Sequence, residues 1–175
     1  MTQSDYIMRM VEQLAQVLKQ IISRRENRQF DSAHKILNEA YESLVGFNAR
    51  IAHQLSDNQI ISLMGGGSQT GNERLILFAE LLSEEAILAE NPDYAKVDAI
   101  SLRVKALSLY LEVVNQSEYW QSDDYVLKIK EIRQMVDLKV IPVHILEKLM
   151  DFYTTLSADK DMNSVQTELL RRNAL

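Results

Sequence analysis

The chain offers few groups that could do chemistry, and the most conspicuous is a glycine-rich loop. Four of its five glycines fall within Gly65–Gly71. Glycine-rich turns that lead into a helix can bind phosphate through backbone N–H groups. The lysine of a phosphate-binding loop is missing, because no lysine lies between Lys35 and Lys96, and no strand pattern precedes the loop. We therefore expect a flexible interhelical loop here rather than a phosphate site.

The three histidines are the second candidates, because two of them stand one helical turn from a carboxylate. Asp31 precedes His34 by three residues, and His144 precedes Glu147 by the same spacing. A di-iron helical bundle needs two Glu-x-x-His motifs and two further inward-facing glutamates. That set is missing, and His53 stands alone. We expect no metal, no cofactor and no catalytic triad, and the absence of cysteine excludes thiolate chemistry. The sequence thus indicates a protein that is not an enzyme.

Charged and aromatic clusters point instead to binding. Residues 73–98 carry seven acidic and two basic side chains and account for most of the net charge of −6. Glu80, Glu84 and Glu85 either form an acidic face for a basic partner or are simply solvated. Tyr119 and Trp120, at a predicted turn, either anchor a partner or fill the gap between two helices. These five residues are the candidate partner-binding residues.

A basic cluster ends the first predicted helix, at Lys19, Arg24, Arg25 and Arg28. It could contact nucleic acid, but basic residues in a last turn also suit the helix dipole. A net charge of −6 disfavours general nucleic-acid binding, because phosphate contacts need cations. A regulator whose helices contact DNA therefore stands as the alternative to a protein-binding role.

The composition defines the elements that must position these groups. Only five glycines and two prolines occur in 175 residues, too few for a sandwich, barrel or propeller, which needs frequent turns. The longest unbroken apolar run, Leu75–Ala79, is far too short to span a bilayer, and we find no targeting signal. These features predict a cytoplasmic, bacterial-type helical protein.

Apolar spacing predicts seven to eight helices. A further short helix is expected at 56–64, because Ser56 and Gln59 form a capping box at its start. The first helix has a seam of alternating four- and three-residue steps from Ile7 through Val11 to Ile21, widened by further apolar residues. Wide apolar stripes on residues 7–22 and 141–156 suggest self-association. The expected helices are 5–25, 31–45, 47–54, 72–90, 94–116, 122–138, 142–156 and 161–172.

One stretch resembles a known helical repeat. Phe30 is followed by Ala33, Leu37 and Ala40, the aromatic and Ala-x-x-x-large-x-x-Ala spacing of a tetratricopeptide repeat's second helix. Residues 17–45 thus resemble one tetratricopeptide unit, and residues 106–129 resemble a poorer copy. The chain is also similar to small all-α proteins of Gram-positive bacteria. The resemblance implies antiparallel hairpins stacked as a short right-handed array.

Together these patterns predict a single all-α domain over residues 1–175. It would comprise an N-terminal hairpin region at 1–64, a flexible joint at 65–71 and a C-terminal array at 72–175. We expect a non-enzymatic protein–protein interaction or scaffold module that binds a protein or peptide partner or forms a homodimer. A DNA-contacting helical regulator is the alternative, and a helical-bundle metal or ligand-binding protein is the second.

Overall fold

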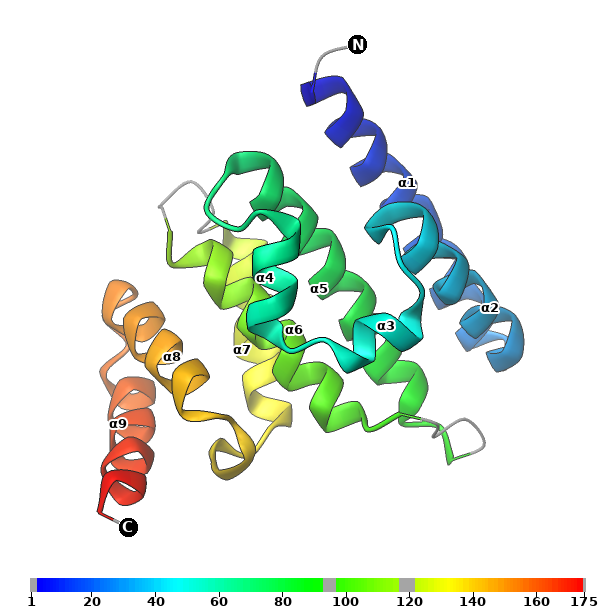
Figure 1. Cartoon of the computed structure of the whole chain (residues 1–175). Coiled ribbons are helices and arrows are strands. Elements are labelled where there is room, and N and C mark those ends of the chain that lie inside the picture. The colour runs from blue at the N-terminus through cyan, green and yellow to red at the C-terminus, as the bar shows by residue number, and fades with distance from the viewer. Residues whose placement is uncertain (1–2, 93–96, 117–121, 175) are drawn as a thin grey trace. The chain divides into compact units, whose positions relative to one another are not determined.

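The protein is all-α, as predicted: a computed structural model describes residues 3–92, 97–116 and 122–174, and every regular element within these ranges is a helix (Figure 1). Within these ranges, side chains are described from residue 9 onward. None of these helices is long and apolar enough to cross a membrane. The elements are α1 (Gln3–Glu26), α2 (Phe30–Ala40), η1 (Tyr41–Val45), α3 (Ala49–Gln54), α4 (Asp57–Met64), α5 (Gln69–Ala89), α6 (Ala99–Val114), α7 (Asp123–Met135), η4 (Leu138–Val140), α8 (Val143–Thr155) and α9 (Asp159–Asn173).

The chain divides into two compact units, Met1–Ala106 and Leu107–Leu175. The boundary falls inside α6 and not at the glycine loop, where the sequence suggests a joint. The two units are described separately below.

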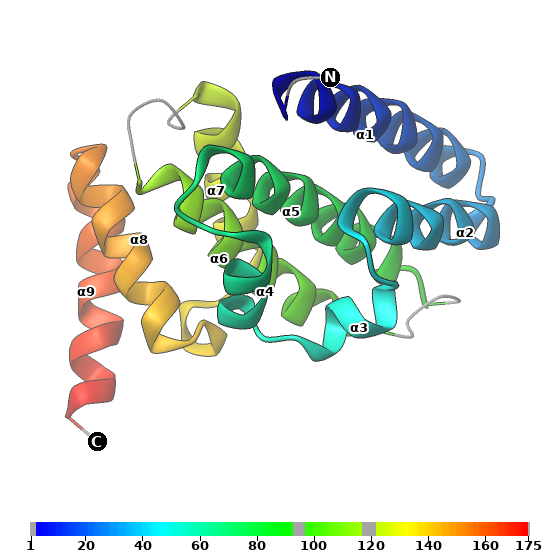
Figure 2. The same cartoon turned by 45° about the horizontal axis from the view of Figure 1, so that its top comes forward.

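The first unit is built on a hairpin of α1 and α2, which run antiparallel and pack together and against α5 (Figures 1 and 2). Ala33, Leu37 and Ala40 of α2 are fully buried or nearly so. Small alanine side chains let helices approach closely, which is the packing expected from the tetratricopeptide-like spacing. Stacking of such hairpins into a regular array stays a prediction.

Helix α2 does not continue as an α-helix to residue 45, as predicted, because its last turn widens into the π-helix η1. Gly46 ends this turn in the left-handed conformation, at a φ of 91°. The widened turn buries Tyr41, Leu44 and Val45. The predicted capping box before α4 is confirmed, since the Ser56 side chain accepts from the Gln59 backbone and the Gln59 side chain accepts from the Ser56 backbone.

The glycine loop is a tight turn between α4 and α5, at the place where the sequence predicts a flexible joint. Gly65 caps α4 in the left-handed conformation, and the Ser68 hydroxyl donates to the Gly65 carbonyl at 2.8 Å. The same hydroxyl accepts from the Gly71 backbone at 3.0 Å and so caps α5. A Cβ on Gly71 would lie 1.8 Å from the Gly65 carbonyl oxygen. The missing side chain of Gly71 therefore permits the two helix ends to pack closely.

The second unit contains the antiparallel hairpin of α8 and α9, which lie side by side in both views (Figures 1 and 2). Leu146, Leu149 and Phe152 of α8 and Val165 of α9 are almost completely buried. The hairpin follows α7 and the short 3-10 helix η4, which the sequence does not predict.

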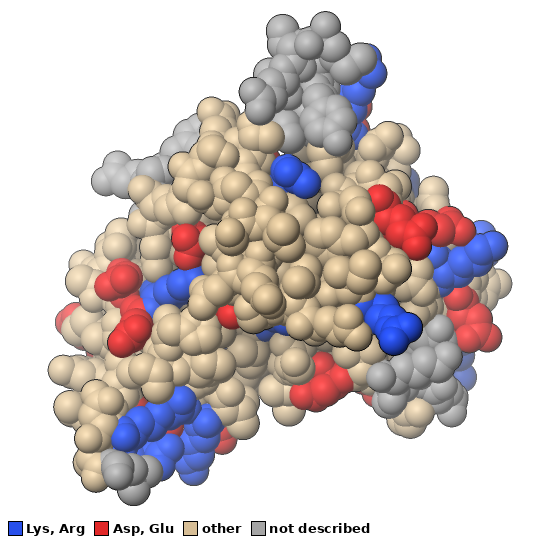
Figure 3. Space-filling model, viewed as in Figure 1, with Lys and Arg blue, Asp and Glu red and all other residues tan. Residues whose placement is uncertain are grey.

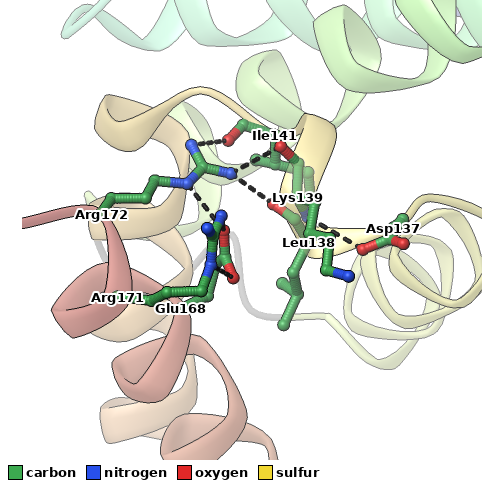
Figure 4. A network of polar contacts seen from close by, with 7 residues as sticks. All are labelled: Asp137, Leu138, Lys139, Ile141, Glu168, Arg171 and Arg172. Atoms are coloured by element: carbon green, nitrogen blue, oxygen red, sulfur yellow. Dashed lines mark hydrogen bonds and ion pairs between the residues drawn. The ribbon is translucent and has the colours of Figure 1, made fainter. Parts of the chain in front are cut away.

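Arg172 fastens the end of α9 to η4 (Figure 4). Its guanidinium donates to the backbone carbonyls of Ile141, Leu138 and Lys139 at 2.7, 2.8 and 2.8 Å. The Leu138 carbonyl also accepts from the Ile141 backbone N–H at 3.2 Å, and the guanidinium supplies a further donor to it as well as to the other two carbonyls. The arginine therefore caps η4 from a position more than thirty residues away.

Glu168 holds this arginine in place. Its carboxylate accepts from Arg172 Nε at 2.8 Å and from Arg171 Nη2 at 2.7 Å (Figure 4). Hydrogen bonds from Arg171 and Arg172 lower the pKa of Glu168 to about 2. The carboxylate is therefore charged at every ordinary pH and keeps α9 fixed to η4.

Candidate functional site

The outer face of α1 carries a short apolar stripe that its own unit leaves uncovered. Met10, Leu14 and Ile21 face the unit and are at most 6% exposed. Val11 lies on another face and is 50% exposed. The predicted burial of Leu14 and Ile21 is confirmed, but that of Val11 is wrong, because Met10 takes its place in the buried line.

The stripe consists of Val11 and Ala15, which are exposed, and Leu18 and Ile22, which are half-buried. With 100° between successive residues, these four positions fall within about 60° around the helix. The stripe is about 17 Å long, because each residue advances the helix by about 1.5 Å. Such a line of residues at four- and three-residue steps is the spacing with which one helix packs against another.

Two opposite charges border the stripe on one side. Glu12 and Lys19 are both exposed and lie seven residues apart, so they share a face of α1. Neither side chain has an ion-pair partner among the residues that the structure describes. Both charges are therefore available to a helix that packs on the stripe.

The stripe has the symmetry that a second copy of α1 requires. Its midpoint lies between residues 16 and 17, and Val11 and Ile22 are equidistant from it, as are Ala15 and Leu18. Two antiparallel copies centred there would place Val11 opposite Ile22 and Ala15 opposite Leu18. Glu12 would then lie two positions, or about 3 Å along the axis, from the level of the partner's Lys19. The contact would occur twice across the two-fold axis.

The acidic residues predicted to meet a partner are mostly internal. Glu85 is 2% and Glu80 is 9% exposed. Glu84 retains 16% exposure of its side chain and pairs with Arg25 at 3.0 Å. The predicted solvated acidic face does not exist for Glu80 and Glu85, because both lie on the buried part of α5 beside buried residues such as Leu81, Leu82 and Ala86.

The other two predicted contact surfaces do not provide a described, exposed surface. Tyr119 and Trp120 lie outside the described residues. The predicted stripe on residues 141–156 is largely buried, since Ile145, Leu146 and Leu149 are at most 2% exposed. Of the two apolar stripes, the one on α1 is therefore the candidate contact surface.

The buried Glu85 belongs to a polar network inside the first unit. Its Oε2 accepts from the Tyr41 hydroxyl at 2.8 Å and lies 2.9 Å from His53 Nε2. Its Oε1 is buried without a hydrogen-bond partner in the described part of the chain. Burial, and then the charge of Glu85, raises the pKa of Tyr41 well above its usual value. Tyr41 therefore keeps its proton and acts as the donor.

Lys105 anchors the same region from α6. Its ammonium donates to the backbone carbonyls of Ala52, His53 and Leu55 at 3.1, 2.9 and 2.7 Å. Burial lowers the pKa of Lys105, and the charges of Asp57 and Glu85 oppose that shift. The lysine thus caps α3 and fixes the backbone that carries His53. Because the Tyr41 hydroxyl, His53 Nε2 and the Lys105 ammonium all have internal partners, we interpret the network as structural.

Two further polar candidates, Arg24 and His34, also have internal partners. Arg24 donates to Gln29 at 2.6 Å, and His34 Nδ1 lies 2.8 Å from Asn38 Nδ2. Within residues 3–92, 97–116 and 122–174, no group of three or more histidines and carboxylates could hold a metal ion.

Helix α4 offers a contrasting surface. Figure 3 shows few charged side chains over α4 and the turn that follows it, in keeping with residues 58–72, which contain no charged residue. Leu63 on this helix is 59% exposed. No opposite charges flank this leucine in the sequence, so Leu63 is a matched control for Val11.

No known protein family matches the chain, and comparison with curated proteins and with solved structures yields no significant match.

Proposed function

We propose that this protein is a non-enzymatic helical interaction module that forms a homodimer through the outer face of α1. The observation that supports this function is the two-fold symmetric apolar stripe with Glu12 and Lys19 beside it. A second copy is the partner that this face fits best, because the same four residues and the same two charges complement themselves when one helix is reversed. Such a self-complementary patch is what a two-fold dimer interface needs.

The dimer is expected to be weak. Four small and medium apolar residues over about 17 Å bury less area than a stable interface of standard size. Association in the micromolar range suits an interaction module that exchanges partners. The absence of cysteine supports a reducing, cytoplasmic location, which is part of the same proposal.

Sedimentation velocity of the full chain over a range of micromolar concentrations tests the proposal. We expect a concentration-dependent increase in sedimentation coefficient that Val11→Glu abolishes. Leu63→Glu, which places the same charge on a somewhat more exposed residue of α4, is the control and should leave association unchanged. A chain that stays monomeric at high micromolar concentration would contradict the proposal, and so would a dimer that only Leu63→Glu dissociates.

A charge reversal tests the antiparallel register. Glu12→Lys should weaken the dimer, because each new lysine would face Lys19 of the partner. The double variant Glu12→Lys with Lys19→Glu should restore association, because both pairs become attractive again. A double variant as weak as the single one would show that these two residues do not face each other across the interface.

A further inference from the structure

The second unit contains a polar cleft that the proposed function does not use. Its volume is about 310 Å³, at the small end of the range for ligand sites. The lining residues come from three helices of this unit, α7, α8 and α9: they are Lys130, Arg133, Gln134, Tyr153, Asp161 and Ser164.

Tyr153 is the residue that marks the cleft as a binding site. Its side chain is only 2% exposed, yet its hydroxyl has no hydrogen-bond partner among the described residues. Burial and the charge of Asp161 raise the pKa of Tyr153, while Arg133 opposes the shift. The phenol therefore stays protonated and presents an unused donor at the cleft wall. A ligand in the cleft that accepts a hydrogen bond from this hydroxyl would use a donor that no described residue engages.

The charges around Tyr153 define the ligand. Lys130 and Arg133 lie three residues apart on α7 and share a face. Lys130 has no partner within the described ranges, and Arg133 uses Nη1 on the Val136 carbonyl, which leaves its other N–H groups. Asp161 on α9 supplies one negative charge without an ion-pair partner in the described chain. The cleft thus presents two cations, one carboxylate and a phenol donor.

The wall formed by α9 is tied to η4 at its C-terminal end. Arg172 and Glu168 tie this helix to η4 (Figure 4). The Ser164 hydroxyl donates to the Lys160 carbonyl at 3.1 Å. Asp161 and Ser164 are therefore held in place relative to η4 before a ligand arrives. Preorganisation of this kind lowers the entropic cost of binding.

We propose that this cleft binds a small acidic amino acid or a close analogue, a molecule with two anionic groups and one ammonium group. Lys130 and Arg133 would each bind an oxyanion, Asp161 would bind the ammonium, and the Tyr153 hydroxyl would donate to a carboxylate oxygen. This site is independent of the α1 dimer, so either proposal can fail without the other.

Isothermal titration calorimetry of the full chain with L-glutamate tests the site. Glutarate, which lacks the ammonium, and 4-aminobutanoate, which lacks one carboxylate, are the comparison ligands. We expect saturable glutamate binding in the millimolar range or tighter, with both comparison ligands weaker. Absence of saturable glutamate binding would overturn the proposal, and so would equal affinity for all three molecules.

Three variants assign the roles. Lys130→Gln should weaken glutamate about tenfold, because a hydrogen bond to a charged group is lost. Lys160→Gln removes the same charge from the same unit outside the cleft and should have little effect. Asp161→Asn should weaken glutamate but strengthen glutarate, because the repulsion of a second carboxylate disappears. Equal losses in Lys130→Gln and Lys160→Gln, or a glutarate affinity that Asp161→Asn leaves unchanged, would contradict the assignment.

Tyr153→Phe separates binding from folding. The hydroxyl has no internal partner, so its removal should weaken glutamate binding without lowering the melting temperature. Unchanged glutamate affinity in this variant would remove Tyr153 from the site and with it the main support for the proposal.

Discussion

The hydroxyl of Tyr41 donates a hydrogen bond of 2.8 Å to the carboxylate of Glu85, which joins η1 to α5 across 44 positions of the sequence. The tyrosine ring lies against Phe78, with ring centroids 5.8 Å apart. The π-helical turn brings this phenol into the core, where it compensates a buried charge. This contact therefore connects the α1–α2 hairpin, which carries the proposed interface, to the rest of the first unit.

Tyr41→Phe should destabilise the protein by about 1–3 kcal/mol, because Glu85 loses a donor while it stays buried. The free energy of unfolding from urea denaturation is the measurement. Tyr153→Phe is the matched control, since it removes a hydroxyl without an internal partner in the described chain and should change stability little. Equal effects of the two substitutions would contradict the role given to the Tyr41–Glu85 bond.

The raised pKa of Tyr41 predicts a loss of stability in alkali. The folded state holds its proton at a pH where the unfolded chain, with a tyrosine pKa near 10, releases it. This contribution is therefore fully present below about pH 10 and declines as the pH rises further toward the folded pKa. Thermal unfolding between neutral pH and alkali should show a decline in melting temperature that is smaller in Tyr41→Phe. An identical decline in both proteins would count against this assignment.

The lowered pKa of Glu168 predicts the opposite sensitivity in acid. Its folded pKa is about 2 against an ordinary value of 4.5, so its contribution is present above 4.5 and is lost as the pH falls toward 2. The glutamine in Glu168→Gln cannot titrate. The melting temperature of this variant should therefore change less steeply with pH in that window. Melting temperatures of the two proteins at several pH values provide the comparison. Parallel curves would show that the Glu168–arginine cluster does not contribute to acid sensitivity.

The α4–α5 turn predicts an order of effects among glycine substitutions. Gly71→Ala should cost about 3 kcal/mol or more, because the new Cβ would collide with the Gly65 carbonyl oxygen. Gly67→Ala should cost about 1 kcal/mol, because its Cβ enters open space and only the positive φ of 92° is unfavourable. Urea denaturation of both variants measures the difference. A flexible joint would tolerate both substitutions equally well.

Much of the helical architecture can be predicted from spacing and caps. The start of α4 follows from Ser56 and Gln59, and the end of η1 follows from Gly46. Both signals are local, because a capping box and a left-handed glycine satisfy backbone groups within a few residues. The turn at Gly65–Gly71 is not predictable in this way, since the same glycines suit a mobile loop and a close packing of two helix ends.

The placement of charges is harder to predict. An acidic run usually indicates a solvated face, but Glu85 is followed by Ala86 and preceded by Leu81 and Leu82, which are all buried. These apolar neighbours within one turn of the helix are the signal for burial of Glu85, and a count of charges alone obscures that signal. Its partner Tyr41 comes from a π-helical turn, which has no simple sequence pattern. The predicted burial of Val11 is wrong for a related reason. Two adjacent lines of apolar residues on α1, one through Met10 and one through Val11, both have helical spacing, and only the first is buried.

Disulfide cross-linking of single-cysteine variants tests the α1 dimer most directly, because the chain contains no cysteine of its own. In the antiparallel arrangement two copies of residue 15 lie about 5 Å apart along the axis, and two copies of residue 11 lie about 17 Å apart. Ala15→Cys should therefore form a covalent dimer under mild oxidation, whereas Val11→Cys should not. Cross-linking of both variants would indicate parallel helices, and cross-linking of neither would contradict a dimer through α1.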